Sequence, residues 1–209
     1  MSSAPKAKIA IVFYSMYNHV KTLAEHIKSS IEDAGCEATL LQVPETLPAG
    51  VLEKMHAPAK DESIPIATAS MLTEYDGILF GIPTRFGMAA AQMKAFMDST
   101  GGLWQSGGLV GKTAGIFFST GTQNGGQETT AMTWVTQLAH HGMIYVPLGY
   151  INPAVFDLST PHGGSAWGPG TLAGADGSRQ PSDLEVGVAK SYGAHFAGIT
   201  AALKAGRSA

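Results

Sequence analysis

The sequence predicts an α/β fold: a doubly wound, five-stranded parallel sheet with helices on both faces. Three observations lead to this prediction. Short apolar runs rich in β-branched residues alternate with longer segments that have helical spacing. The first run, 9–14, is continuously apolar rather than alternating, as expected for a parallel strand covered on both faces. The chain has 209 residues, of which 44% are apolar, so it can bury a sizeable core.

The elements follow in order along the chain. After the strand at 9–14, a helix is expected over 20–34, with Gly35 as its C-terminal stop. The apolar residues of this helix share one face: Val20, Leu23, Ala24, Ile27 and Ile31. The other expected strands are 38–43, 77–82, 113–119 and 143–147, and the other expected helices are 89–98, 128–141 and 184–203. Five strands favour a flavodoxin-like strand order over the longer dinucleotide-binding order.

The whole chain, 1–209, is predicted to form one domain with two insertions, at about 44–73 and 152–183. The first insertion contains four prolines, and the second is rich in Gly, Pro, Ser and Thr with little periodicity. Loops of this length in a compact domain are usually functional or part of an interface. A tolerated surface insertion is the alternative for the second one.

Composition excludes several function classes. The formal net charge is −3, and the sequence has no long run of residues with the same charge, so electrostatic binding to nucleic acid is not expected. Cys36 is the only cysteine, which rules out an intrachain disulfide and a cysteine metal cluster. No apolar stretch reaches the length of a membrane span. We therefore expect a cytoplasmic protein without an integral membrane segment.

Polar loops follow the first, third and fourth strands, and the carboxyl ends of such strands meet in one crevice. The first loop, 15–19, opens a helix, where free backbone N–H groups and the helix dipole suit a phosphate. It contains no Lys or Arg and lacks three spaced glycines, so a monophosphate fits better than a triphosphate or pyrophosphate. Ser15 as a simple helix cap is the alternative.

The second and third loops suit a planar ring. In the second loop, 83–88, Thr84 offers a hydroxyl, Arg85 a cation and Phe86 a flat apolar wall, which favours a heterocycle that gains negative charge on reduction. A rigid turn with an exposed arginine is the alternative. In the third loop, 119–126, hydroxyls alternate with glycines that let backbone N–H groups approach a ring edge or a phosphate.

Together the loops resemble the WrbA family of flavodoxin-like NAD(P)H:quinone oxidoreductases. The matching stretches run from the first strand to the last helix: 14–17, 83–87, 101–104, 119–122, 125–128, 138–143 and 176–181. Asn18 stands where this family commonly has Gly. Because Asn tolerates a left-handed backbone better than most residues, the turn is expected to survive.

The resemblance implies FMN as the cofactor. It implies that the three loops and one helix end contact FMN, and that Gln123 and Asn124 do so only through their backbone. The implied contact residues are Ser15, Met16, Tyr17, Asn18, His19, Val20, Pro83, Thr84, Arg85, Phe86, Ser119, Thr120, Gly121, Thr122, Gln123, Asn124, Gly125 and His140.

The resemblance also implies roles around the ring. His140, as the catalytic residue, would reach the flavin from a neighbouring subunit or an adjacent helix end. Tyr17 and Trp104 would flank the pocket in which nicotinamide or quinone stacks. Trp104 is expected on a mobile, glycine-flanked segment, with a core or interface position as the alternative. No metal site is expected, because His140 and the adjacent His141 point in different directions on a helix.

The implied activity is the two-electron, ping-pong reduction of quinones to hydroquinones with NADH or NADPH as the electron donor. The family is similar to tetrameric enzymes, so a homo-oligomer, dimer or tetramer, is expected. Two alternatives remain open: a flavodoxin-type electron carrier, and an FMN-binding stress or scaffold protein without turnover.

Overall fold

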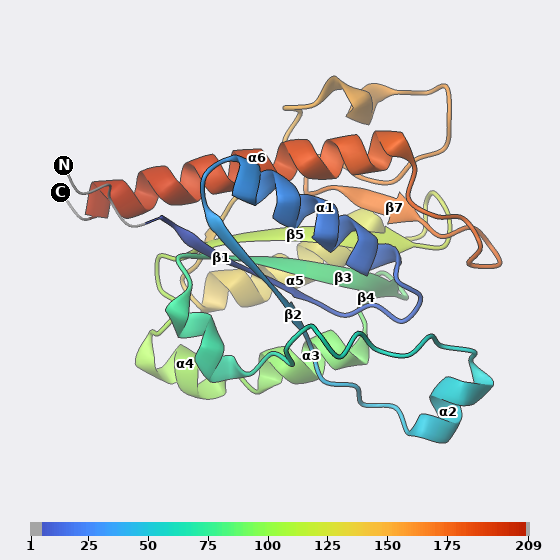
Figure 1. Ribbon diagram of the computed structural model, residues 1–209, viewed down its shortest axis with the longest axis horizontal. Coiled ribbons are helices and arrows are strands. Elements are labelled where there is room, and N and C mark those ends of the chain that lie inside the picture. Colours follow the sequence, from blue (N-terminus) through green and yellow to red (C-terminus); the bar gives the residue numbers. More distant parts are fainter. Residues whose placement is uncertain (1–5, 208–209) are drawn as a thin grey trace.

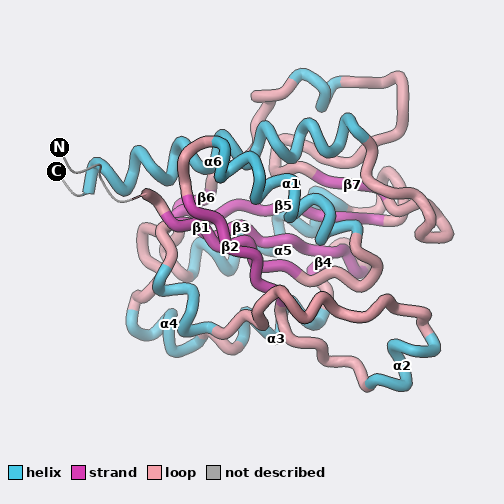
Figure 2. The backbone as a smooth tube through the Cα atoms, in the orientation of Figure 1, coloured by secondary structure: helices cyan, strands magenta, loops and turns pink. Residues whose placement is uncertain are grey.

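The centre of the molecule is a parallel sheet with the strand order β2-β1-β3-β5-β6, seen in a computed structural model that describes residues 6–207 (Figures 1 and 2). The strands of this order are β1 (Lys8–Phe13), β2 (Glu37–Gln42), β3 (Gly77–Arg85), β5 (Thr113–Thr120) and β6 (Ile144–Tyr145). Two short strands extend it: β4 (Met88–Ala89) is antiparallel to the end of β3, and β7 (Gly170–Leu172) is parallel to the end of β5. The predicted α/β fold is confirmed.

Helices cover both faces of the sheet, as Figure 1 shows. On one face lie α1 (His19–Asp33) and α6 (Asp183–Arg207), and on the other lie α3 (Ala91–Asp98) and α5 (Gln127–His140). Four short helical segments lie in the connections: α2 (Ala49–Lys54), α4 (Gly101–Ser106), and the 3-10 helices η1 (Ala69–Glu74) and η2 (Pro153–Phe156). Among the described residues, no helix combines the length and the apolar character needed to cross a membrane.

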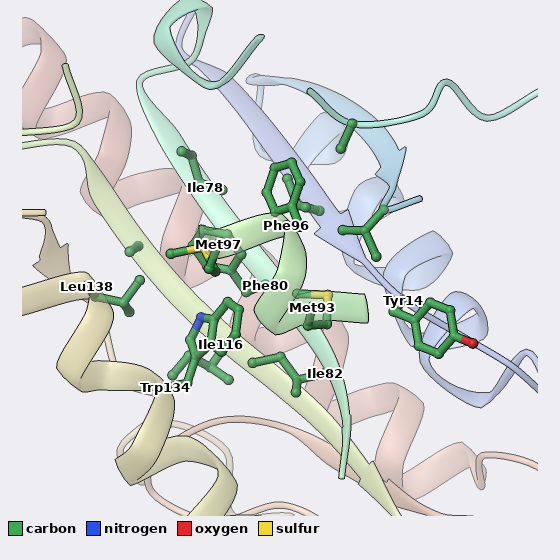
Figure 3. Packing of buried hydrophobic residues seen from close by; sticks show 14 of the residues in the cluster. Tyr14, Ile78, Phe80, Ile82, Met93, Phe96, Met97, Ile116, Trp134 and Leu138 are labelled. Atoms are coloured by element: carbon green, nitrogen blue, oxygen red, sulfur yellow. The ribbon is translucent and has the colours of Figure 1, made fainter. Parts of the chain in front are cut away.

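The sheet separates two hydrophobic cores because successive side chains of a strand point to opposite faces. Ile9, Ile11 and Phe13 of β1 pack beneath α1 and α6. Ala10 and Val12 of the same strand pack on the side of α3 and α5. Figure 3 shows this second core, in which apolar residues of β3 and β5 meet α3 and α5: Ile78, Phe80, Ile82, Met93, Phe96, Met97, Ile116, Trp134 and Leu138.

The first helix behaves as its sequence pattern predicts. Every residue of its predicted apolar face is buried, and Gly35 follows the helix end with a left-handed backbone, φ 87°. This face packs against α6, where Gly193 allows a close approach. A Cβ atom at position 193 would lie 2.1 Å from the Ser30 hydroxyl and 2.8 Å from the Ile27 carbonyl oxygen.

The fifth strand differs from the prediction, because it is split into two pieces. The sequence predicts one strand at 143–147, but β6 pairs only with the start of β5. The end of β5 pairs instead with β7, which lies inside the segment predicted to be an insertion. The sequence gives no strand signal here because close packing requires glycine, which is unfavourable in strands. A Cβ at Gly170 would lie 2.5 Å from the Gln127 side-chain oxygen, and one at Gly168 would lie 2.1 Å from the Ile116 carbonyl oxygen.

Two other predicted segments need correction. The helix predicted at 89–98 begins at Ala91, because residues 88 and 89 pair with β3 as β4. The segment predicted to be a mobile stretch carrying Trp104 is the helix α4. The segment 44–73 holds α2 and η1 and is attached beside β2, where the Gln42 amide donates to the carbonyls of Asp61 (2.7 Å) and Ile64 (2.8 Å).

Candidate functional site

The carboxyl ends of β1, β3 and β5 surround a cavity of about 290 Å³. Its volume lies near the lower end of the range for small-molecule sites. All three predicted loops contribute to its lining, together with two residues that the sequence did not indicate: Ser15, Met16, Tyr17, His19, Met55, Pro83, Thr84, Arg85, Ser119, Thr120, Gly121 and Ala173.

A row of free backbone N–H groups lies in the first loop. Within the described chain, the five N–H groups from Met16 to Val20 have no hydrogen-bond acceptor. The turn depends on Asn18, the N-cap of α1, which has a left-handed backbone with φ 68°, as the sequence predicts. Ser15 is not the N-cap, although its hydroxyl accepts a hydrogen bond from the Lys21 N–H at 3.3 Å. Free N–H groups at the start of a helix form a binding site for an anion.

The loop rests on a partly buried hydrogen-bond network centred on Glu45. The Tyr14 hydroxyl donates to Glu45 Oε2 at 2.8 Å, and the Gln92 amide donates to Glu45 Oε1 at 2.7 Å. Burial alone would raise the pKa of Glu45, but hydrogen bonds from Gln92, the Leu47 N–H and Tyr14 hold it below its usual value. Burial raises the pKa of Tyr14, and its bond to Glu45 raises it further. Tyr14 therefore keeps its proton and Glu45 stays ionised.

Lys60 orients the first peptide of the loop. Its ammonium group lies 3.2 Å from the Ser15 carbonyl oxygen, 3.5 Å from Glu45 Oε2 and 4.1 Å from the centroid of the Tyr14 ring. Burial lowers the pKa of Lys60. Because the peptide bond is planar and trans, a Ser15 carbonyl that faces Lys60 turns the Met16 N–H in the opposite direction.

The second loop is a tight β-hairpin. Pairing of Thr84 with Ala89 and of Arg85 with Met88 leaves a turn of two residues at its tip. These are Phe86, with φ 53°, and Gly87, with φ 74°, and two positive φ angles are the mark of a type I′ turn. The Thr84 hydroxyl lies 2.9 Å from that of Thr130 on α5, which fixes its position beside the cavity.

Phe86 is not in the lining of this cavity. It is 99% exposed and lies at the rim of a second, larger cavity of about 610 Å³. Arg85 lines both cavities. The second cavity lies between the hairpin, α3 and α5, and its lining is largely apolar: Arg85, Phe86, Met88, Ala89, Ala91, Lys94, Thr133, Trp134 and Gln137.

The third loop divides into two parts. Ser119, Thr120 and Gly121 line the first cavity, whereas the side of the loop at 122–124 lines a polar cavity of about 370 Å³ together with His162. Within the described residues, the N–H groups of 121–124 also lack an acceptor. Gly125 lines neither cavity, and a Cβ there would lie 2.8 Å from the Thr122 carbonyl.

The structure does not bring every predicted site residue together. The Val20 side chain is buried in the core beneath α6, so only its backbone can face a ligand. His140 is exposed at the far end of α5, about 20 Å along the helix from the loops. Trp104 is 59% exposed on α4, which lies beside that far end of α5 (Figure 1). There the Thr100 hydroxyl lies 2.8 Å from His141 Nε2. Burial lowers the pKa of His141. Within one chain, neither His140 nor Trp104 reaches the cavity.

Two contacts from distant segments complete the cavity. The Tyr17 hydroxyl donates to the Met55 carbonyl at 3.0 Å, so the segment 44–73 forms one wall. His19 is 5% exposed, and its Nε2 donates to the Arg179 carbonyl at 2.8 Å. Ala173, just after β7, forms another part of the lining. No pattern in the sequence points to Met55 or Ala173, because their places depend only on tertiary packing.

Comparison with known protein families identifies the family of this chain. The sequence model of a family described as NADPH-dependent FMN reductase matches residues 17–155. The chain belongs to this family. Among curated relatives of the chain, quinone-oxidoreductase QR2 of Triphysaria versicolor is 59% identical over 199 residues, which is 94% of this chain and 97% of that protein. NAD(P)H quinone oxidoreductase PST2 of Candida albicans is 54% identical over 191 residues, 91% of this chain and 94% of that protein.

Solved structures similar to this chain show the same fold. A flavodoxin, WrbA-like protein from Agrobacterium tumefaciens has a TM-score of 0.65 at 24% identity, covering 93% of this chain and 98% of that one. Oxidised flavodoxin 2 from Bacillus cereus has a TM-score of 0.59 at 18% identity, covering 92% of this chain and 99% of that one. The resemblance to WrbA-like, flavodoxin-like proteins that the sequence predicts is confirmed.

Proposed function

We propose that this chain is an FMN-dependent NAD(P)H:quinone oxidoreductase that reduces quinones to hydroquinones in two-electron, ping-pong turnover. The observation that carries the proposal is the row of five free N–H groups at the mouth of a cavity built by three strand ends. Membership of an FMN reductase family and 59% identity to a quinone oxidoreductase support it.

The residues present fit the phosphate end of FMN. The N–H groups from Met16 to Val20 suit a monophosphate, because they lie together at the start of α1, lack acceptors in the described chain and need no cationic side chain. The Ser15 hydroxyl oxygen accepts from the Lys21 N–H, which stabilises the loop and leaves the O–H of Ser15 free to donate to the anion.

The residues present also fit the ring. The backbone N–H of Gly121 lies at the cavity and can approach the polar edge of a heterocycle, and Pro83, Thr84 and Arg85 form another part of the lining. When bound, FMN would supply hydride acceptance from the nicotinamide and electron transfer to the quinone. Arg85 would stabilise negative charge that develops at the site, and Tyr17 would bound the space in which a flat substrate lies.

Assembly of several copies would supply the remaining predicted residues. Trp104 and His140 lie at the end of the molecule opposite the cavity of the same chain, and both side chains are exposed. In a dimer or tetramer, these side chains of one copy would enter the cavity of another, where Trp104 would face the quinone and His140 would hold or move a proton.

This assembly predicts that turnover depends on protein concentration. Dilution below the point at which the oligomer dissociates should lower quinone turnover per chain, in step with the oligomer fraction measured by light scattering. Full turnover by monomers at the same dilution would refute the shared site, although not FMN binding.

One assay tests the function. The purified protein is mixed with FMN, with NADH or NADPH, and with benzoquinone, and initial rates are measured while both substrates are varied. Parallel double-reciprocal lines are expected, because both substrates use one cavity in turn. Intersecting lines would contradict ping-pong turnover. One-electron reduction of the flavin without turnover would indicate an electron carrier, and flavin binding without any reduction would indicate a scaffold protein.

A further inference from the structure

A buried carboxylate outside the cavity organises its far wall. Glu185, in the first turn of α6, is fully buried, and both of its carboxylate oxygens accept hydrogen bonds. Arg179 Nη1 lies 3.1 Å from Oε1 and 2.9 Å from Oε2. Four further donors converge on the two oxygens: the N–H groups of Gly163 (2.9 Å), Leu172 (3.1 Å) and Ser182 (2.8 Å), and the hydroxyl of Thr171 (2.9 Å).

Glu185 and Arg179 together fix the end of β7. Glu185 accepts from the N–H of Leu172, and Arg179 Nη1 donates to the carbonyl of the same residue at 2.7 Å. The Arg179 N–H donates to the Ala173 carbonyl at 2.9 Å. Ala173 lines the cavity, and its own N–H donates to the carbonyl of Thr120 in the third loop. The ion pair is therefore anchored to the end of β7, whose own backbone pairing with β5 holds Ala173 in the lining.

The same pair reaches the first loop through His19. The Arg179 carbonyl accepts a hydrogen bond from His19 Nε2 at 2.8 Å. His19 is buried, lines the cavity and lies within the row of free N–H groups. A continuous chain of contacts thus runs from Glu185 through Arg179 to the loop at 15–20.

We propose that Glu185 and Arg179 are positioning residues that hold His19, and with it the anion-binding loop, in place for the phosphate of the cofactor. The proposal rests on the proposed binding of FMN and goes beyond it, because neither side chain lines the cavity. It gives a role to the segment 176–181, which resembles the WrbA pattern and contributes Arg179.

The test compares two flavins that differ only in the phosphate. Glu185→Gln keeps the shape of the side chain but removes the charge and places an N–H₂ group among converging donors. Dissociation constants for FMN and for riboflavin are measured with the purified protein by flavin fluorescence. FMN should bind about tenfold more weakly to the variant, as expected for a lost charge-assisted interaction, while riboflavin binding changes less than about twofold.

A matched control is Glu32→Gln on α1, whose carboxylate pairs with Lys28 on the surface. It should leave the affinities for both flavins unchanged. Equal weakening of both flavins by Glu185→Gln, or no weakening of either, overturns the proposal. Failure of the unaltered protein to bind FMN would instead overturn the proposed function.

A double variant shows whether the effect passes through His19. In a His19→Ala background, Glu185→Gln should no longer change the ratio of FMN to riboflavin affinity. A change in this ratio as large as in the unaltered background contradicts the route. If Glu185→Gln does not fold, Arg179→Lys serves in its place, since it keeps the positive charge but loses most donors; it should show the same selective loss for FMN, and equal loss for both flavins overturns the proposal.

Discussion

Asn18 sets the direction of the backbone where β1 passes into α1. Its φ of 68° is left-handed, and the N–H groups on either side of it lack acceptors in the described chain. Asn visits this conformation at low cost because its short side chain is polar and unbranched at Cβ, whereas a β-branched residue is strained there. The geometry of the anion-binding loop therefore depends on one residue type at one position.

Asn18→Val should lower the free energy of unfolding by about 1–2 kcal/mol, because the left-handed backbone is strained for a β-branched residue. It should also weaken FMN binding, since a change in the backbone angles at position 18 would reorient the free N–H groups on either side of it. Asn18→Gly, the matched control, should keep both properties. Urea unfolding and a flavin titration measure the two effects, and a Val variant that binds FMN as tightly as the unaltered chain would contradict this reading of the loop.

Phe86 carries backbone strain without burial. Its left-handed turn position favours Asn or Gly, and its ring is 99% exposed, so the folded chain gains little from the side chain. Phe86→Asn should raise the free energy of unfolding by about 0.5–1 kcal/mol, measured by urea unfolding. We expect the same variant to lower quinone turnover, because strained, exposed residues are retained where they serve a ligand. A more stable variant with unchanged turnover would remove Phe86 from the site.

The contact between α1 and α6 depends on one glycine in a helix that contains several. At Gly193 an added Cβ would lie 2.1 Å from the Ser30 hydroxyl and 2.8 Å from a backbone oxygen, whereas at Gly198 nothing lies within 4 Å. Both residues are in α6, so they share the same gain in helix propensity on substitution by alanine.

Gly193→Ala should destabilise the protein by about 1–3 kcal/mol, because overpacking outweighs the propensity gain. Gly198→Ala should stabilise it by about 0.5–1 kcal/mol. Thermal unfolding of the two variants side by side measures the difference. Equal shifts for both would show that α1 and α6 are not in close contact in solution.

Elements with a regular apolar period could be predicted from the sequence, and elements defined by close packing could not. The buried face of α1 is predicted because its period is local, and Gly35 marks its end. The strand β7 is missed because its residues include the glycine that the neighbouring Phe118 and Gln127 require. In the same way, the loops after β1, β3 and β5 are found because each follows a recognisable strand. Met55 and Ala173 are missed because only tertiary contacts bring them to the cavity.

The free energy of unfolding should depend on pH through carboxyl groups that accept hydrogen bonds in the folded state. Burial alone would raise the pKa of Glu185, but Arg179 and the surrounding donors hold it below its ordinary value of 4.5. The pKa of Glu45 is lowered as well. A carboxyl group with a lowered pKa in the folded state stabilises the fold above its ordinary pKa, and this contribution is lost as the pH falls.

The free energy of unfolding should therefore decrease as the pH is lowered from about 5 towards about 3, where these carboxylates take up protons. Urea unfolding across this range measures the slope. Glu185→Gln should show a shallower slope than the unaltered chain, because it removes one of the groups that titrate. Parallel slopes for the two proteins would mean that Glu185 binds protons equally in the folded and unfolded states.

The division of the fifth strand has a consequence for motion. β6 and β7 are attached to opposite ends of β5, and the long stretch of chain between them adds no pairing to the middle of that edge. The two halves are nevertheless joined through that stretch, because the Tyr145 hydroxyl of β6 donates to the Trp167 carbonyl and the Gly149 N–H donates to the Ala166 carbonyl at 2.8 Å. We therefore expect local opening of the edge beside the cavity to loosen β6 as well, so that the amide protons of both halves exchange together.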